Sequence, residues 1–144
     1  MASALYNAWK YRQLGDTSIS PINHKTDTLK LALVTSSYTP DIDAHDFFDD
    51  ITNEVAASGS YAAGGATLSV TTSVDTTDDE GVLDATDITF TTFTGTARYA
   101  ILYKSTGSAA TSPLIAVIDL GQDYTATGGP FALTFSSEGI ININ

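Results

Sequence analysis

The chain of 144 residues contains no cysteine and few basic residues. Without cysteine, neither a disulfide nor a thiolate metal site can form. Lysine and arginine together number six against 17 acidic residues, so the formal net charge is −11. Phosphate or anionic-membrane binding needs a basic face, and we therefore expect no nucleic-acid or membrane partner. The acidic surface has two readings, a source of solubility or the complement of a basic partner surface.

Residues that carry catalysis are also scarce. Histidine occurs only at His24 and His45, and neither a His-Glu-x-x-His nor a Gly-x-Ser-x-Gly motif is present. Gly64-Gly65 lacks the Lys-Ser/Thr that completes a phosphate loop. Because a catalytic site needs convergent reactive groups, we predict that the chain is not an enzyme and uses no cofactor.

Long apolar runs are missing as well. No run reaches the length of a membrane span, and Lys10 and Arg12 follow Trp9 too closely for a signal-peptide core. We expect synthesis in a cytoplasm. The length suits one domain, which we divide into an N-terminal helix or arm at residues 1–20 and a β-sandwich at residues 21–144.

The stretch from Arg98 to Asp119 is the clearest structural signal. Residues 98–104 and 113–119 are β-rich apolar runs, and a polar linker containing Gly107 separates them. Tyr99, Ile101 and Tyr103 share one face of the first run, with Ala100 and Leu102 on the other. Both runs are apolar on both faces, so the pattern predicts a hairpin at the centre of a sheet, covered on both sides.

The remaining pattern predicts an all-β protein, an antiparallel sandwich or jelly roll of about eight strands. Residues 28–34 form a strand with Leu29, Leu31 and Leu33 on one face. Further strands are expected at residues 54–61, 66–74, 82–83, 87–93, 131–135 and 141–143. Turns or loops are expected at residues 75–81, at Gly95-Thr96 and at residues 121–130.

Two helices are expected beside these strands. Residues 1–14 show helical spacing of Leu5, Ala8, Trp9 and Arg12. The second helix lies near residues 40–51, where Thr39-Pro40-Asp41 provides a cap, a first-turn proline and a first-turn acid.

Two acidic stretches are candidates for a metal site. Asp41 to Asp46 superficially resembles a calcium loop but lacks its glycine and its bidentate glutamate, and helix capping explains the same acids. Asp75, Asp78, Asp79 and Glu80 could hold Ca²⁺ between loops, or form a solvated hairpin tip. We favour the readings without an ion and predict no metal.

Four residues are candidates for partner binding: Leu5, Trp9, Arg12 and Tyr38. The first three lie on one face of a helix too short to be stable alone, which must dock on its own sandwich or on a neighbour. Tyr38 lies beside a turn, where an aromatic side chain can anchor an interface. Both docking alternatives stay open.

Several stretches together resemble a family of small virion structural proteins of tailed bacteriophages. The resemblance begins at Ala-Leu-Tyr-Asn (residues 4–7) and includes Leu-Lys-Leu-Ala-Leu-Val (29–34) and Ala-Arg-Tyr-Ala-Ile-Leu-Tyr-Lys (97–104). The full set of matching stretches is 27–34, 37–41, 43–47, 54–55, 58–61, 64–68, 84–90, 97–104, 107–116 and 118–121.

The resemblance implies an assembly role without catalytic residues. Such proteins resemble capsid decoration (cement) proteins on the outer surface of the head lattice. The implied partner is the major capsid protein, the implied location is the virion, and a lattice three-fold would favour a homotrimer. The alternatives are a tail- or fibre-associated structural protein and a carbohydrate-binding virion appendage that uses loop tyrosines and Ca²⁺.

Overall fold

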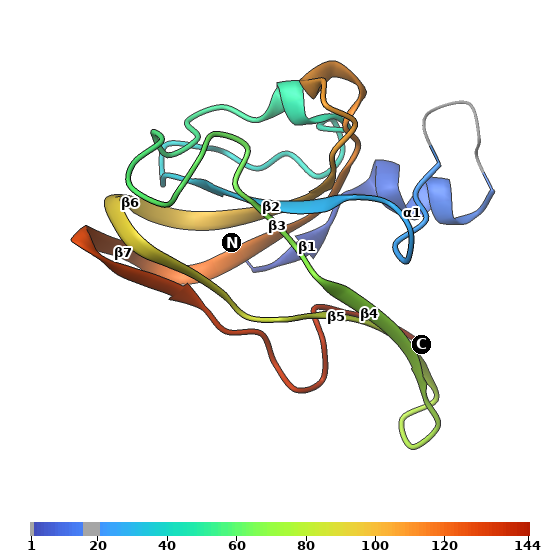
Figure 1. The fold of residues 1–144 in the computed structure, drawn as a ribbon. Helices are drawn as coiled ribbons and strands as arrows, with labels where there is room; N and C mark the ends of the chain where they lie inside the picture. Colours follow the sequence, from blue (N-terminus) through green and yellow to red (C-terminus); the bar gives the residue numbers. More distant parts are fainter. Residues whose placement is uncertain (1, 16–20) are drawn as a thin grey trace.

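The computed structural model describes residues 2–15 and 21–144, and it is an all-β protein with two antiparallel sheets (Figure 1). The larger sheet has the strand order β1-β7-β6-β2-β3, and the smaller has the order β4-β5-β8. The strands are β1 (Ala4–Leu5), β2 (Leu29–Val34), β3 (Ala66–Thr67), β4 (Val70–Asp75), β5 (Glu80–Ala85), β6 (Ile88–Lys104), β7 (Leu114–Leu133) and β8 (Ile141–Ile143). The predicted fold class is therefore confirmed.

The predicted central hairpin is formed by β6 and β7, with β2 beside β6. Its apolar faces are covered on both sides, as expected. Ala100 and Leu102 belong to the core between the two sheets, whereas Ile101 and Tyr103 belong to a second core on the outer face. Burial on both faces is what a strand without a polar face requires.

A bulge in the hairpin interrupts the alternation of inward and outward side chains along the second run, residues 113–119. Leu102 pairs with Ala116 but Tyr103 pairs with Leu114, so Ile115 has no partner across the ladder. The extra residue turns the Ile115 side chain toward the core between the sheets, while Leu114 enters the outer core.

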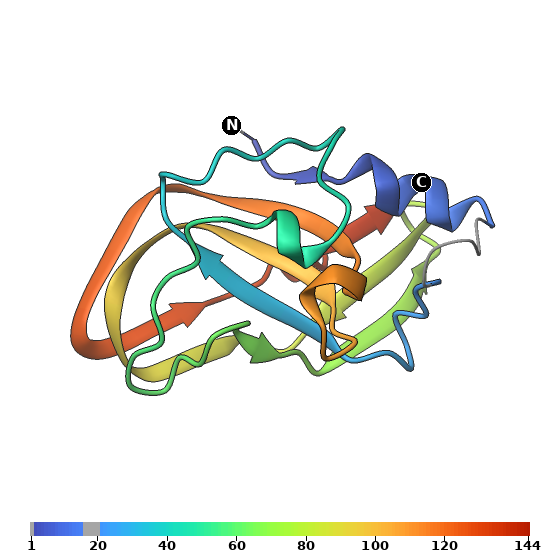
Figure 2. The ribbon, with the colours of Figure 1, turned by 90° about the horizontal axis from the view of Figure 1, so that it is seen from above.

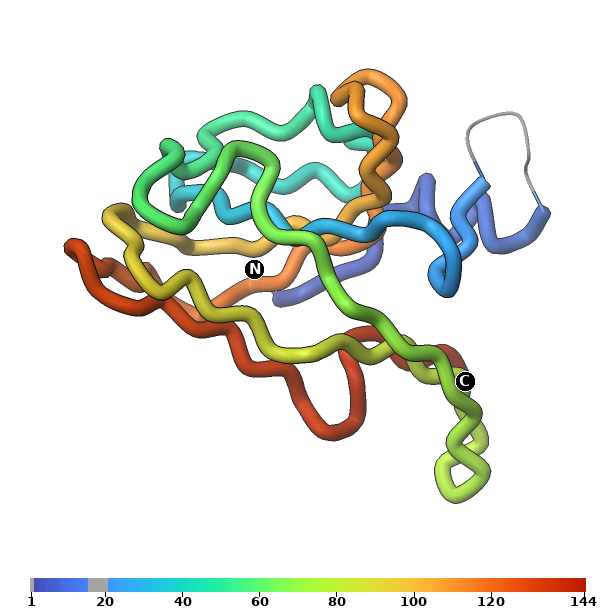
Figure 3. The backbone as a smooth tube through the Cα atoms, viewed as in Figure 1, coloured from blue at the N-terminus to red at the C-terminus, as the bar shows by residue number. Residues whose placement is uncertain are grey.

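Both hairpin strands continue far beyond the predicted segments and bend back on themselves (Figures 1 and 3). The turn expected at Gly95-Thr96 and the loop expected at residues 121–130 are therefore wrong, because both lie inside strands. Register shifts mark irregularities between Phe90 and Tyr99. Gly121 and Gly128 have positive φ angles of 86° and 69°, which bend the ladder without ending it.

The smaller sheet covers the inner face of the larger one. Leu83, Ala85 and Ile141 pack there with Phe90, Phe93 and Phe131 from the far half of the long hairpin. The strand expected at residues 66–74 is divided between the two sheets, as β3 and β4. At residues 54–61 the structure has isolated bridges, Val34 to Glu54 and Ser58 to Tyr61, in place of a strand.

The N-terminal helix is shorter than predicted: α1 spans Asn7–Gln13. Leu5 is extended in β1 and pairs with Ala116, and the Tyr6 amide donates to the Ile115 carbonyl at 3.1 Å. Because the backbone of Leu5 and Tyr6 pairs with β7, these residues cannot form the first helical turn that the spacing of Leu5, Ala8 and Trp9 predicts. Among the described residues, no helix is long and apolar enough to cross a membrane.

The expected helix near residues 40–51 is reduced to one 3₁₀ turn, Phe48–Asp50. Asp41 does cap a turn, because its carboxylate accepts from the amides of Asp43 and Ala44 at 3.1 and 3.0 Å. Beyond it, tertiary hydrogen bonds replace helical ones. The Leu114 amide donates to the Asp46 carbonyl, and the Phe48 amide donates to the Ser112 carbonyl.

The loop of residues 35–53 then crosses the outer face of the larger sheet (Figure 2). Its Tyr38, Ile42, Phe48 and Ile51 close the outer core, and Phe48 stacks on Tyr103 with ring centroids 4.1 Å apart. The second layer that the hairpin needs on this side is therefore an irregular loop.

Candidate functional site

The four predicted partner-binding residues are largely committed to contacts within the chain. Trp9 and Tyr38 are 3% and 1% exposed, Arg12 is also buried, and Leu5 is half-buried. Of the two docking alternatives, the structure has the N-terminal segment (residues 4–13) on its own sandwich. As anchors for a partner, Trp9, Arg12 and Tyr38 offer almost no surface in this conformation.

Tyr6 and Tyr38 join the N-terminal segment to the outer loop through a buried hydrogen-bond chain. The two hydroxyls are 2.9 Å apart, and the Tyr38 hydroxyl lies 2.8 Å from Nδ1 of His45. Burial raises the pKa of Tyr6 and of Tyr38, so both remain neutral phenols. Sequence spacing did not indicate this series of hydrogen bonds, because Tyr6 is distant in the sequence from Tyr38 and His45.

Arg12 extends from α1 to the acidic part of the same loop. Its guanidinium carbon lies 5.2 Å from the centroid of the Phe47 ring. Burial and the neighbouring Asp50 raise the pKa of Asp46, and Arg12 opposes them. Burial alone would raise the pKa of Asp50, but the amides of Asp46 and Phe47 hold it below its ordinary value. The acids therefore serve local turn and ion contacts.

The second anchor of the N-terminal segment is Trp9. Its indole Nε1–H donates to Nε2 of His24 at 2.9 Å, and the two rings meet edge to face. A cavity of about 200 Å³ adjoins this pair. Its walls come from α1, from His24 and from the smaller sheet: Trp9, Gln13, His24, Thr72, Ser73, Gly81, Val82, Leu83, Ile141 and Ile143.

An apolar groove continues from this cavity along β8. One part has a volume of about 430 Å³. One of its walls is formed by the N-terminal segment and β7, and the other by residues 140–142. Another, of about 300 Å³, lies between α1 and the C-terminal residues 142–144. Of the described residues that line either part, Lys10 is the only one with a charged side chain. The described lining of the groove thus contains no acidic side chain, on a chain that is acidic as a whole.

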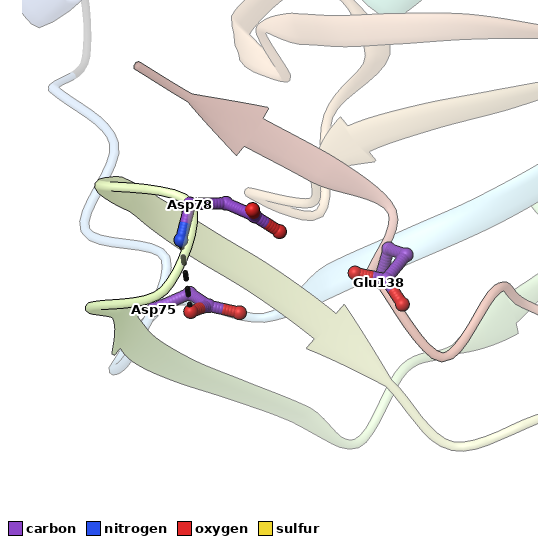
Figure 4. A group of neighbouring side chains, drawn as sticks. All are labelled: Asp75, Asp78 and Glu138. Carbon is purple, nitrogen blue, oxygen red and sulfur yellow. Dashed lines mark hydrogen bonds between the residues drawn. The ribbon is translucent and has the colours of Figure 1, made fainter.

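The acidic turn between β4 and β5 forms as predicted, and the structure adds a carboxylate from elsewhere. Asp75, Asp78 and Glu138 have carboxylate oxygens within 4.8 Å of one another (Figure 4). Glu138 follows β7 and is distant in sequence, so spacing could not reveal it. The amides of Thr77 and Asp78 donate to the Asp75 carboxylate and lower its pKa, which explains Asp75 as a turn residue. The members are mostly exposed, as solvated acids commonly are.

Glu54 makes half-buried polar contacts that the sequence did not indicate. Its carboxylate accepts from the Tyr61 hydroxyl at 2.9 Å and from the Gly64 amide at 2.6 Å. The Tyr61 hydroxyl in turn accepts from the Leu33 amide at 2.9 Å. These bonds hold the loop of residues 54–65 against β2, which is a structural task.

Comparisons with protein-family models, curated proteins and solved structures found no match to this chain. The chemistry open to this chain therefore follows from its own side chains. Within the described residues, the polar clusters are turn caps, ion pairs and aromatic hydrogen bonds, and the surfaces open to a partner include the groove along β8 and the exposed side of α1.

Proposed function

We propose that this chain is a structural protein of a bacteriophage virion, a capsid decoration (cement) protein that binds the outer surface of the head lattice and stabilises it. The observation that carries the proposal is the extent of the sequence resemblance. Its stretches include residues 29–34, 97–104 and 107–116, which lie in or join β2, β6 and β7. The resemblance therefore concerns the residues that build the core of this fold.

Two physical features support the proposal. The central hairpin is sealed on both faces, and a domain of this kind suits a task that requires durability and no chemistry. The net charge of −11 disfavours DNA and favours a basic surface on the partner, which is the major capsid protein in this proposal. A homotrimer at the lattice three-fold axes is part of the same proposal.

The proposal is tested with heads assembled from the major capsid protein in the absence of this chain. Purified chain is added, and the heads are sedimented. We expect saturable co-sedimentation and a higher temperature of head disruption. Because charge complementarity contributes, raised salt should weaken binding. Chain that stays in the supernatant at every concentration would contradict a capsid role.

Whether the N-terminal segment contacts the capsid shell is tested by single-residue substitutions. Deleting residues 1–14 would remove Tyr6 and Trp9 from the cores, so loss of binding would report damage to the fold. Tyr11 and Leu14 are 63% and 86% exposed, and Tyr11→Ala with Leu14→Ala leaves the cores intact. If α1 contacts the shell, this pair lowers co-sedimentation, whereas Val74→Ala on the smaller sheet does not.

The same material separates the alternative roles. A tail- or fibre-associated protein would bind purified tails in place of heads. A carbohydrate-binding appendage would bind sugars on a glycan array and give heat on titration with Ca²⁺. Silence in both of these experiments would remove the binding-module alternative.

A further inference from the structure

The chain has a single tryptophan, and its hydrogen bond places a strict condition on His24. An indole Nε1–H can donate a hydrogen bond but cannot accept one. Nε2 of His24, 2.9 Å away, must therefore be unprotonated while the bond exists. In the neutral ring the proton then lies on Nδ1. When the ring takes a second proton, Nε2–H faces Nε1–H, and the bond is lost.

The groups around His24 favour the neutral ring. Burial lowers the pKa of His24, and Asp27 opposes this only in part. The Asp27 carboxylate is itself paired with the Lys104 ammonium at 3.0 Å. The described residues that line the cavity beside the ring, from α1 and the smaller sheet, have neutral side chains. Among the described groups, a proton on His24 thus has the partial compensation of Asp27.

The other histidine, His45, lies near the opposite end of the N-terminal segment. It contacts Tyr38, whose hydroxyl is hydrogen-bonded to Tyr6. His45 Nδ1 meets the Tyr38 hydroxyl, which can donate or accept. The Asp41 amide also donates to His45 Nδ1, at 3.4 Å. The groups facing His45 are Tyr38, the Asp41 amide and the acidic turn with Asp50. His45 thus contacts Tyr38 of the outer core, whereas Trp9 belongs to the core between the sheets, and His45 is therefore the matched control for His24.

We propose that the Trp9–His24 hydrogen bond is a proton-operated latch, which holds α1 on the sandwich while His24 is neutral and releases it when His24 is protonated. Release would uncover Trp9 and open the adjoining cavity of about 200 Å³, while β1 and Tyr6 keep the segment attached. The latch goes beyond the virion role and belongs to the isolated chain.

The pH range follows from the sign of the shift. Because the pKa of His24 is lowered in the folded chain from its ordinary 6.5, the unfolded chain binds more protons between the two values. The stabilisation is fully present above pH 6.5 and is lost as the pH falls from there through the folded pKa. Between pH 6.5 and that pKa, the ratio of latched to released chain should fall by up to about tenfold per pH unit, and at lower pH it should level off.

The test is nuclear magnetic resonance of the full chain between pH 8 and pH 4.5. The single indole N–H gives one resonance, and its protection from exchange is compared with free tryptophan at each pH. We expect protection to fall in the wild type with a midpoint below pH 6.5. The His24→Gln variant retains an acceptor that does not titrate, and should stay protected. His45→Gln, the matched control, should behave as the wild type does.

A second measurement needs no variant. The ring resonances of His24 report its own titration, and their midpoint should coincide with the loss of indole protection. A different midpoint, an indole that stays protected at pH 4.5 while His24 is protonated, or a His24→Gln chain that loses protection as the wild type does would each overturn the latch.

Discussion

The central hairpin (residues 98–104 and 113–119) and the smaller sheet are both antiparallel. They differ in how many of their faces are covered by other parts of the chain. In the hairpin, residues from Ala100 to Leu102 are buried, and both faces lie against a core. In the smaller sheet, Leu83 is buried on the inner face while Val74 is 77% exposed. The number of covered faces thus follows the apolar pattern, and the hairpin buries more apolar side chains than the smaller sheet does.

The largest effect should come from truncating the hairpin. Leu102 has no exposed surface, so Leu102→Ala removes fully buried methyl groups. The change should lower the free energy of unfolding by about 2–5 kcal/mol. Val74→Ala, the matched change on the smaller sheet, should cost less than about 0.5 kcal/mol. Urea denaturation measures both. Equal losses would show that the two regions contribute alike and contradict the comparison.

A smaller effect separates two glycines that share a positive φ. A Cβ on Gly65, at φ 74°, would lie 1.8 Å from the Leu31 carbonyl oxygen of β2. Gly107, at φ 89° in the hairpin loop, would meet nothing within 4 Å. Gly107→Ala should therefore cost about 1–2 kcal/mol for the backbone alone, and Gly65→Ala clearly more. Thermal unfolding of the two variants ranks them, and the reverse order would refute the steric argument.

The hairpin pattern was strong enough to predict the core and its two covered faces from sequence. The turns predicted at glycines were wrong. Glycine is typical of turns, but Gly95, Gly121 and Gly128 lie within continuous strands and allow them to bend. Local spacing also failed at residues 40–51, since hydrogen bonds to Ser112 and Leu114 replace helical ones. Such long-range pairing has no local signature.

The candidate site was less predictable for the same reason. Trp9 and Tyr38 were singled out, but their partners His24, Tyr6 and His45 could be found only in three dimensions. The sequence indicated that the helix had to dock without indicating on what. Likewise, Glu138 joins the acidic turn through the path of the chain after β7.

The smallest expected effects concern acid stability. Asp119 in β7 accepts from the Gly121 amide and pairs with Arg98 at 2.9 Å, and these contacts lower its pKa. Asp75 in the smaller sheet has a pKa lowered mainly by the turn amides of Thr77 and Asp78, without an ion pair among the causes. For both acids, the stabilisation is present above the ordinary value of 3.8 and is lost as the pH falls below it.

The acid prediction is checked with Asp119→Asn and Asp75→Asn, by thermal unfolding from pH 7 to pH 2. Each should lower the unfolding temperature at pH 7, with Asp119→Asn the larger because it also breaks an ion pair. The difference from the wild type should shrink as the pH falls below 3.8. A difference that persists at pH 2 would mean that geometry, and not ionisation, is responsible.

The most direct test of the proposed role is cryo-electron microscopy of the virions in which the proposal places this chain. The proposal predicts density for a two-sheet β domain on the outer head surface at three-fold or quasi-three-fold axes, with an apolar or acidic surface of the domain against the shell. Density on the tail, or a head lattice bare of this domain, would contradict the decoration role.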